Sequence, residues 1–233
     1  MSLATELIAD VNGALSFTWN IRDGTVVPDT DDVALVGGAV RLRATMLYAD
    51  LSDSTELAMN VDSRVVARYF KAFLAVSSRL IRARAGHIRS FDGDRVMGVF
   101  LGSSKNTSAM KCALNINWVF TKVIEPKFKA KYDSLNQRIL GHCVGVDTSE
   151  VVVVRAGIRG SNDLVWIGRA PNVAAKLSGI REPGYSSYVS PDVYRVAHDS
   201  VKVHEGQAMW EERGWQEIGE LGGVFRSSWW WEP

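Results

Sequence analysis

The sequence has few cysteines and no excess of either charge. Its two cysteines, Cys112 and Cys143, are far apart and form no CxxC pair, so neither a disulfide framework nor a cysteine-rich metal site is expected. The 27 Lys and Arg residues against 26 Asp and Glu residues leave a net charge of +1. Dedicated nucleic-acid binders and polybasic membrane anchors have a strongly basic surface. We therefore expect no nucleic-acid partner and no direct membrane contact.

Long apolar runs and histidine motifs are also missing. No run approaches the roughly 18 apolar residues of a membrane span, and no basic flank precedes an apolar stretch at the N-terminus. The four histidines, His87, His142, His198 and His204, form no HExxH pattern, which argues against a histidine-ligated zinc site. Together with two thiols expected to stay reduced, these absences predict a cytoplasmic protein.

The composition is that of a globular protein, with 46% hydrophobic and 23% charged residues. Residues 1–40 read as an N-terminal flanking segment, with a short helix over 4–19 and an acidic turn near 26–32. The pattern changes at Arg41, and we expect one main domain over 41–233.

The main domain begins with an apolar strand over 41–49, and Asp53 with Glu56 fits a capping box at the start of a helix. An apolar stripe of period four predicts a long helix over 62–84. Asp92-Gly93 then predicts a hairpin between strands 87–91 and 94–100.

Further elements follow in a similar alternation. They are a helix over 104–130 that Pro126 kinks or ends, strands at 137–146 and 150–157, a hairpin at 161–163, a helix at 170–180, a strand at 186–190 and a helix at 191–197. This order predicts an α+β fold with helices packed over a mainly antiparallel sheet.

Two carboxylates are notable for their positions. Asp50 ends the first strand, and Asp94 opens the second strand of the hairpin. In a ferredoxin-like β-α-β-β order these strands are neighbours, so both carboxylates project from one edge of the sheet. Hard oxygen ligands beside a helix N-terminus suit Mg²⁺ or Mn²⁺ with a polyphosphate. The alternative is that both acids only cap turns.

Three segments resemble the signature blocks of class III nucleotidyl cyclases, in the same order. They are LYADLSDST (47–55), SFDGDRVMGVF (90–100) and IGRAPNVAAKL (167–177). The resemblance covers about Arg41 to Ser190. It implies a ferredoxin-like class III catalytic domain over 41–233 and a phosphoryl transfer that uses two Mn²⁺ or Mg²⁺ ions per site.

The resemblance also assigns roles to residues near the first strand. Asp50 and Asp94 match the two metal-binding aspartates, with the carbonyl of Leu51 as a further ligand. Amide groups in the turn after Asp50 would bind phosphate oxygens at the helix start. The residues of that turn are Ser52, Asp53, Ser54 and Thr55.

Two positions of the third block carry the remaining chemistry. Asn172 matches the asparagine that orients the ribose, and Lys176 stands where the family has an arginine that stabilises transition-state charge. Lysine keeps the charge but lacks the planar fork of arginine. Arg155 or Arg169 are alternative sources of that charge.

The family lysine that holds the terminal phosphates has no clear counterpart. The corresponding stretch is residues 219–223, and only Arg213 or Arg226 offer a substitute from another place.

The positions that read the base in adenine-specific enzymes hold Ser90 and Val165 here. The polar pair that reads adenine is absent, as is the glutamate typical of guanine, so both purines are disfavoured. The sequence is similar to the bacterial pyrimidine cyclases of the Pycsar anti-phage systems. This implies UTP, or CTP as the alternative, as substrate, with Tyr48, Arg89 and Arg95 as candidates for the base pocket.

The resemblance implies partners as well. The product would activate a separate effector, and a head-to-tail homodimer would build each site from both chains. The competing hypothesis is a non-catalytic domain that binds nucleotide and signals by dimerisation, which the altered Lys176 favours. Trp229, Trp230 and Trp231 are assigned no chemistry and are expected to form an edge strand that packs on the domain or on a partner chain.

Overall fold

The computed structural model describes residues 2–214 and 222–233, which divide into two units. Unit 1 comprises Met1–Leu42 and Glu150–Ile167, and unit 2 comprises Arg43–Ser149 and Gly168–Pro233. Strands β2 (Gly38–Leu51) and β5 (His142–Ile158) each run through a boundary between the units. The division of the chain at residue 40 into a flanking and a catalytic domain stays a prediction.

Unit 1 begins with helix α1 (Leu3–Ser16), which has no buried residue among those described. Strand β1 (Asn20–Asp23) pairs in parallel with the start of β2, and β6 (Ser161–Gly168) pairs with the end of β5.

Unit 2 contains most of the sheet, in the strand order β10-β11-β7-β5-β2-β4-β3. Its remaining strands are β3 (His87–Asp92), β4 (Arg95–Phe100), β7 (Ser187–Val189), β10 (Glu211–Arg213) and β11 (Val224–Ser227). A separate small hairpin joins β8 (Val203–His204) and β9 (Gln207–Ala208). Its helices are α2 (Ser54–Asn60), α3 (Ser63–Ala83), α4 (Lys105–Val119), α5 (Glu125–Lys131), α6 (Asp133–Asn136), α7 (Arg169–Ser178) and α8 (Pro191–Val196).

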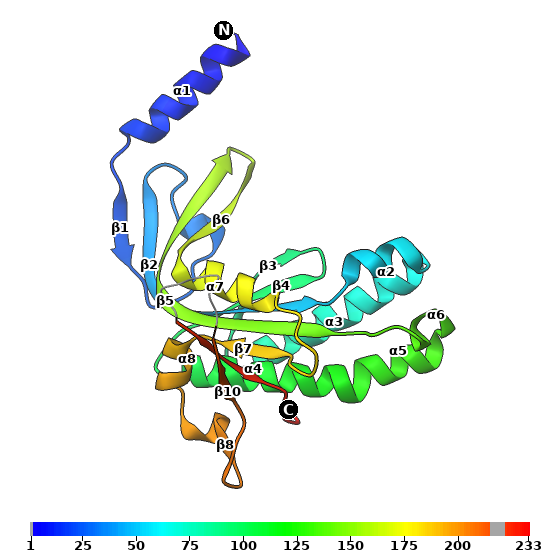
Figure 1. Cartoon of the computed structure of the whole chain (residues 1–233). Coiled ribbons are helices and arrows are strands. Elements are labelled where there is room, and N and C mark those ends of the chain that lie inside the picture. Colours follow the sequence, from blue (N-terminus) through cyan, green and yellow to red (C-terminus); the bar gives the residue numbers. More distant parts are fainter. Residues whose placement is uncertain (1, 215–221) are drawn as a thin grey trace. The chain divides into compact units, whose positions relative to one another are not determined.

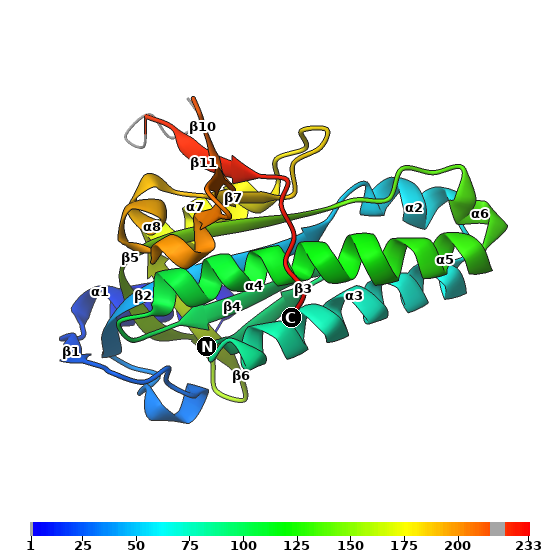
Figure 2. The same cartoon turned by 90° about the horizontal axis from the view of Figure 1, so that it is seen from below.

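Helices cover both faces of this sheet. Helices α3 and α4 lie side by side along one face (Figure 2), and α7 lies on the opposite face from α4 (Figure 1). Alternate residues of β5 face opposite sides of the sheet. Val144 and Val146 pack in the core beneath α3 and α4, whereas Cys143 packs with Leu177 of α7. The fold is the predicted α+β class, with helices over a mainly antiparallel sheet.

Helix α7 approaches the sheet very closely at Gly145. A Cβ placed there would meet the carbonyl oxygen of Ala174 at 2.2 Å and the amide nitrogen of Ser178 at 2.4 Å. Only glycine leaves room for the helix backbone at this distance. Gly145 therefore sets how α7 sits on β5.

Several local predictions were wrong. Residues 147–149 do not break the strand: β5 is continuous over 142–158 because Asp147 and Thr148 find tertiary partners in Arg169 and the Ala44 carbonyl. Asp53 does precede a helix, but in a left-handed conformation (φ 56°) without a side-chain cap, so the capping box is absent.

The long helix predicted over 104–130 is interrupted differently from expectation. Pro126 lies in the first turn of α5, where its missing N–H costs little, and a π-helical turn over Phe120–Ile124 connects α4 to α5. No helix within the described ranges is long and apolar enough to span a membrane.

Candidate active site

The end of β2 and the β3–β4 hairpin form one side of a cavity in unit 2. Asp92 pairs with Arg95, so Gly93 and Asp94 make a two-residue turn, one residue later than predicted. Gly93 has φ 60°, which glycine adopts without strain. Because β4 lies between β2 and β3, the turn that joins β3 to β4 lies at the same end of the strands as Asp50.

The cavity has a volume of about 750 Å³. It is lined by Asp50, Leu51, Asp53, Ser54, Thr55, Glu56, Met59, Asp92, Gly93, Asp94, Arg95 and Arg181. The structure thus brings together Asp50 and Asp94, the two carboxylates expected to converge, with most of the turn between β2 and α2.

The two carboxylates lie in a cavity where acidic side chains outnumber basic ones. Burial raises the pKa of Asp50, and the nearby charge of Asp94 raises that pKa further, while hydrogen bonding to Arg181 opposes both effects. Oδ2 of Asp94 is buried and accepts no hydrogen bond from the described residues. A buried carboxylate oxygen without a donor is unfavourable unless a cation satisfies it.

Divalent ions fit this arrangement. Asp50, Asp94 and the Leu51 carbonyl offer the hard oxygen ligands that Mg²⁺ and Mn²⁺ prefer, and a nucleotide would supply phosphate oxygens. Across the described part of the chain, no group of three or more His, Cys, Asp or Glu side chains is arranged for an ion.

In the turn between β2 and α2, fewer backbone amides are available to bind phosphate oxygens than the sequence predicts. The Ser52 amide donates to the carbonyl of Gly141 at 2.9 Å, so it is engaged within the protein. The amides of residues 53–55 belong to the start of α2, where N–H groups lack partners inside the helix.

Two of the candidate base-pocket residues, Tyr48 and Ser90, lie in one row across the sheet. Tyr48 of β2 lies opposite Met97 of β4, which lies opposite Ser90 of β3, and directly opposed residues share a face of the sheet. The Tyr48 hydroxyl donates to the Met97 sulfur at 3.1 Å, and Arg95 lies 5.4 Å from the centre of the Tyr48 ring. Arg89 occupies the irregularity in β3 between Ile88 and Ser90.

Tyr48 and Asp50 project from the same face of β2 because they are two residues apart, and the intervening Ala49 belongs to the α3–α4 core. Burial raises the pKa of Tyr48, so its hydroxyl is a donor at neutral pH. Val165 lies in β6 of unit 1 with 44% of its surface exposed.

Asn172 and Lys176 lie one turn apart on the exposed side of α7, whose other side packs on the sheet. The Asn172 amide donates to the Gly168 carbonyl at 3.2 Å. Neither residue is among the described residues that line the carboxylate cavity. Within one chain, therefore, the structure does not bring them to that cavity.

The alternative basic residues are already engaged. Arg169 pairs with Asp147 and Asp192, and Arg155 pairs with Asp31 and Asn162. Both arginines are therefore engaged within the protein. Lys176 is the exposed basic residue of the segment IGRAPNVAAKL (167–177).

Near the C-terminus, Arg213 and Arg226 both bind the carboxylate of Glu182. Part of the stretch expected to hold the terminal-phosphate lysine, residues 219–221, lies outside the described residues.

Arg181 is the cavity residue that sequence reasoning missed. It follows α7, and its guanidinium donates to Asp50, 131 residues away in the chain. No motif marks it, because only the tertiary fold brings the end of α7 beside β2.

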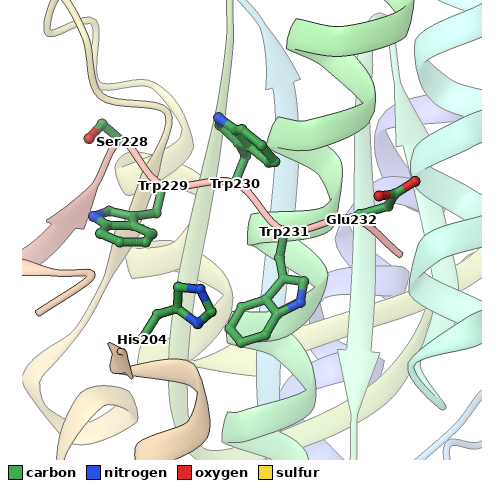
Figure 3. A pocket seen from close by; sticks show the side chains of 6 residues that line it. All are labelled: His204, Ser228, Trp229, Trp230, Trp231 and Glu232. Atoms are coloured by element: carbon green, nitrogen blue, oxygen red, sulfur yellow. The ribbon is translucent and has the colours of Figure 1, made fainter. Parts of the chain in front are cut away.

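The tryptophan tail packs within its own unit, but not as a strand. Asn115 and Asn117 of α4 donate to the carbonyls of Trp231 and Trp229 at 2.7 and 2.9 Å, which hold the tail against the helix. Trp229 and Trp231 flank His204 and line an apolar cavity of about 500 Å³ together with Trp230, whose ring points away from His204 (Figure 3).

Comparison with known proteins is informative at both the sequence and structure levels. A uridylate cyclase from Rhodovulum sp. (strain MB263) is 46% identical over 237 residues, which cover 100% of this chain and 99% of that protein. A uridylate cyclase from Burkholderia cepacia is 40% identical, with 99% of each chain covered. No family model matches.

Among solved structures, the adenylyl cyclase CyaB from P. aeruginosa superposes with a TM-score of 0.69 over 81% of this chain and 95% of that chain. Its sequence identity is 20%, so this likeness concerns the fold. The predicted class III cyclase fold is confirmed.

Proposed function

The chain belongs to the uridylate cyclases, a group of nucleotidyl cyclases with the class III fold, and we propose that it converts UTP into 3′,5′-cyclic UMP and pyrophosphate. In this reaction the ribose 3′-oxygen forms a bond to the α-phosphorus. The bond from that phosphorus to the oxygen bridging to the β-phosphate breaks, and pyrophosphate leaves.

The observation that carries the proposal is the convergence of Asp50 and Asp94 in one cavity of a chain 46% identical to a uridylate cyclase. Asp50, Asp94 and the Leu51 carbonyl would hold two Mn²⁺ or Mg²⁺ ions. Bound there, the ions would lower the pKa of the 3′-hydroxyl and neutralise charge on the leaving pyrophosphate.

The protein groups around this site position the substrate. Amides of Asp53, Ser54 and Thr55 lie at the N-terminus of α2, where they would donate to phosphate oxygens. Tyr48, on the face of β2 that carries Asp50, would contact the base, with Arg89 and Arg95 as further candidates. Ser90 and Val165 replace the polar pair that reads adenine in the family, which supports the preference for a pyrimidine.

Asn172 and Lys176 complete the site from a second chain. Their placement away from the carboxylate cavity of their own chain supports a homodimer in which each site uses the cavity of one subunit and α7 of the other. Asn172 would orient the ribose, and Lys176 would stabilise charge on the phosphate oxygens.

The experiment is turnover of the four nucleoside triphosphates, each supplied separately with Mn²⁺ and analysed by chromatography. UTP should give cyclic UMP and pyrophosphate, with CTP slower and ATP and GTP poor. Preferential use of CTP would make the protein a cytidylate cyclase, and preferential use of a purine would contradict the pyrimidine assignment. No turnover together with nucleotide binding would support the non-catalytic alternative.

The proposed biological role is production of a second messenger in anti-phage defence, with cyclic UMP acting on a separate effector. Its support is the resemblance to Pycsar cyclases, and the corresponding test is whether the chain, expressed together with a candidate effector that responds to cyclic UMP, protects bacteria from phage.

A further inference from the structure

Arg181 binds the two β2 oxygen atoms that the proposed metal site requires. One guanidinium nitrogen, Nη2, donates to Oδ2 of Asp50 at 3.0 Å and to the carbonyl oxygen of Leu51 at 3.2 Å. The other, Nη1, donates to the carbonyls of Ser178 and Ile180 at 2.7 and 3.0 Å. A single side chain therefore connects the metal-site end of β2 to the C-terminal end of α7.

The contact is partly shielded from solvent, since 35% of the Arg181 side chain and 17% of the Asp50 side chain are exposed. Charge-assisted hydrogen bonds of this kind are among the stronger ones in proteins. A divalent ion that coordinates Oδ2 of Asp50 and the Leu51 carbonyl would need the two oxygen atoms that Nη2 already contacts, and it carries the same sign of charge. The ion and the guanidinium therefore compete for these oxygens.

We propose that Arg181 is a built-in competitor of the metal ion: it holds Asp50 and Leu51 when no ion is bound and has to leave them for an ion to bind. The inference rests on the proposed metal site. Arg181 is then a positioning residue. While it holds Asp50 and Leu51, a higher concentration of metal ion, or of metal-nucleotide complex, is needed to fill the site.

Release of Arg181 also affects α7. Its Nη1 donates to the carbonyls of Ser178 and Ile180 at the C-terminal turn of α7. In this turn the amides of Gly179 and Ile180 donate to the carbonyls of Lys176 and Leu177. Because α7 carries Asn172 and Lys176, metal binding at Asp50 of one subunit would alter the end of the helix that this subunit supplies to the second site.

The first test measures Mn²⁺ binding to the nucleotide-free protein by electron paramagnetic resonance. Arg181→Gln should bind Mn²⁺ about tenfold more tightly than the wild type, the factor expected when one competing charged hydrogen bond is lost. Arg95→Gln is the matched control, because Arg95 lines the same cavity and acts on Asp50 through charge, yet pairs with Asp92. It should gain clearly less.

Equal gains in the two variants, or no gain in Arg181→Gln, would overturn the proposal. Failure of the metal site itself looks different: Mn²⁺ binding would then be absent from the wild type and both variants, or would be unaffected by Asp94→Asn.

The second test is hydrogen exchange at the end of α7. In the wild type, Mn²⁺ should accelerate exchange of the Gly179 and Ile180 amides. In Arg181→Gln the exchange should be fast already and should not respond to Mn²⁺. Wild-type exchange that Mn²⁺ leaves unchanged would contradict the link between Asp50 and α7.

Discussion

At the scale of single residues, the cavity concentrates negative charge without enough positive charge to balance it. Asp50 has a raised pKa, and Oδ2 of Asp94 is buried without a donor from the described residues. Such an arrangement is unfavourable for folding and favourable for binding cations. The carboxylates are therefore best explained by what they bind.

We expect Asp50→Asn and Asp94→Asn each to reduce turnover at least about a hundredfold, because each removes a charge that holds divalent ions. The melting temperature without metal should change little. In Asp50→Asn, relief from burial of the charge and from repulsion by Asp94 offsets the weakened contact with Arg181, and in Asp94→Asn the changed carboxylate has an Oδ2 that accepts no hydrogen bond from the described residues. Turnover assays and thermal unfolding check both statements.

Glu56→Gln is the matched control, since Glu56 lines the same cavity but pairs with Arg138 outside the metal site. It should keep most of the activity. Substantial activity in either folded aspartate variant would contradict the metal assignment.

His142 makes stability depend on pH. Burial lowers the pKa of this imidazole to about 3; its ring centre lies 4.3 Å from that of Phe120 in a tilted arrangement. The unfolded chain binds a proton below a pH of about 6.5 and the folded chain does not, so stability falls as the pH drops from about 6.5 toward 3.

The slope should reach about 1.4 kcal/mol per pH unit for this one group, and His142→Phe should remove it. Urea unfolding at several pH values between 4.5 and 7.5 measures the difference. Parallel pH profiles for wild type and variant would contradict the assignment.

At the scale of elements, the placement of α7 depends on a single missing side chain. Gly145→Ala would drive a methyl group into the backbone of the helix at Ala174 and Ser178. Overpacking of this kind costs about 1–3 kcal/mol. We expect a lower melting temperature and, because α7 carries Asn172 and Lys176, a larger loss of turnover than the loss of stability explains.

Gly13→Ala provides the control, because a Cβ at this position of α1 meets nothing within 4 Å. A glycine-to-alanine change inside an exposed helix should raise stability slightly. If Gly145→Ala behaved like Gly13→Ala, the close packing of α7 on β5 would be wrong.

At the scale of the whole molecule, the proposed catalytic residues fall into two sets that one chain does not bring together. Asp50 and Asp94 line the cavity, and Asn172 and Lys176 lie on the exposed side of α7. A two-fold dimer that places α7 of one subunit over the cavity of the other satisfies both placements and creates two equivalent sites.

Mixing inactive Asp94→Asn chains with inactive Asn172→Ala chains should therefore restore activity. Each mixed dimer has one site with both changes and one with neither. Random pairing of equal amounts makes about half the dimers mixed, so about one site in four is intact. If mass spectrometry shows that subunits exchanged and no activity returns, each site is built within a single chain.

Much of this protein follows from local sequence. The stripe in 62–84 predicts α3 (Ser63–Ala83), the segment around Asp92 and Gly93 predicts the β3–β4 hairpin, and three short blocks indicate the cyclase family. These signals are readable because the period of a helix, the conformation of a turn and the residue types that bind a metal are decided within a few residues.

Tertiary structure decided the features whose cause lies far away in the chain. Residues 147–149 extend β5 because Arg169 and the Ala44 carbonyl bind them, although their polar sequence alone favours a turn. Arg181 reaches Asp50 across 131 positions, and Gly145 matters only because α7 lies against it. Each depends on a neighbour that comes close only after folding, so no local pattern in the sequence records it.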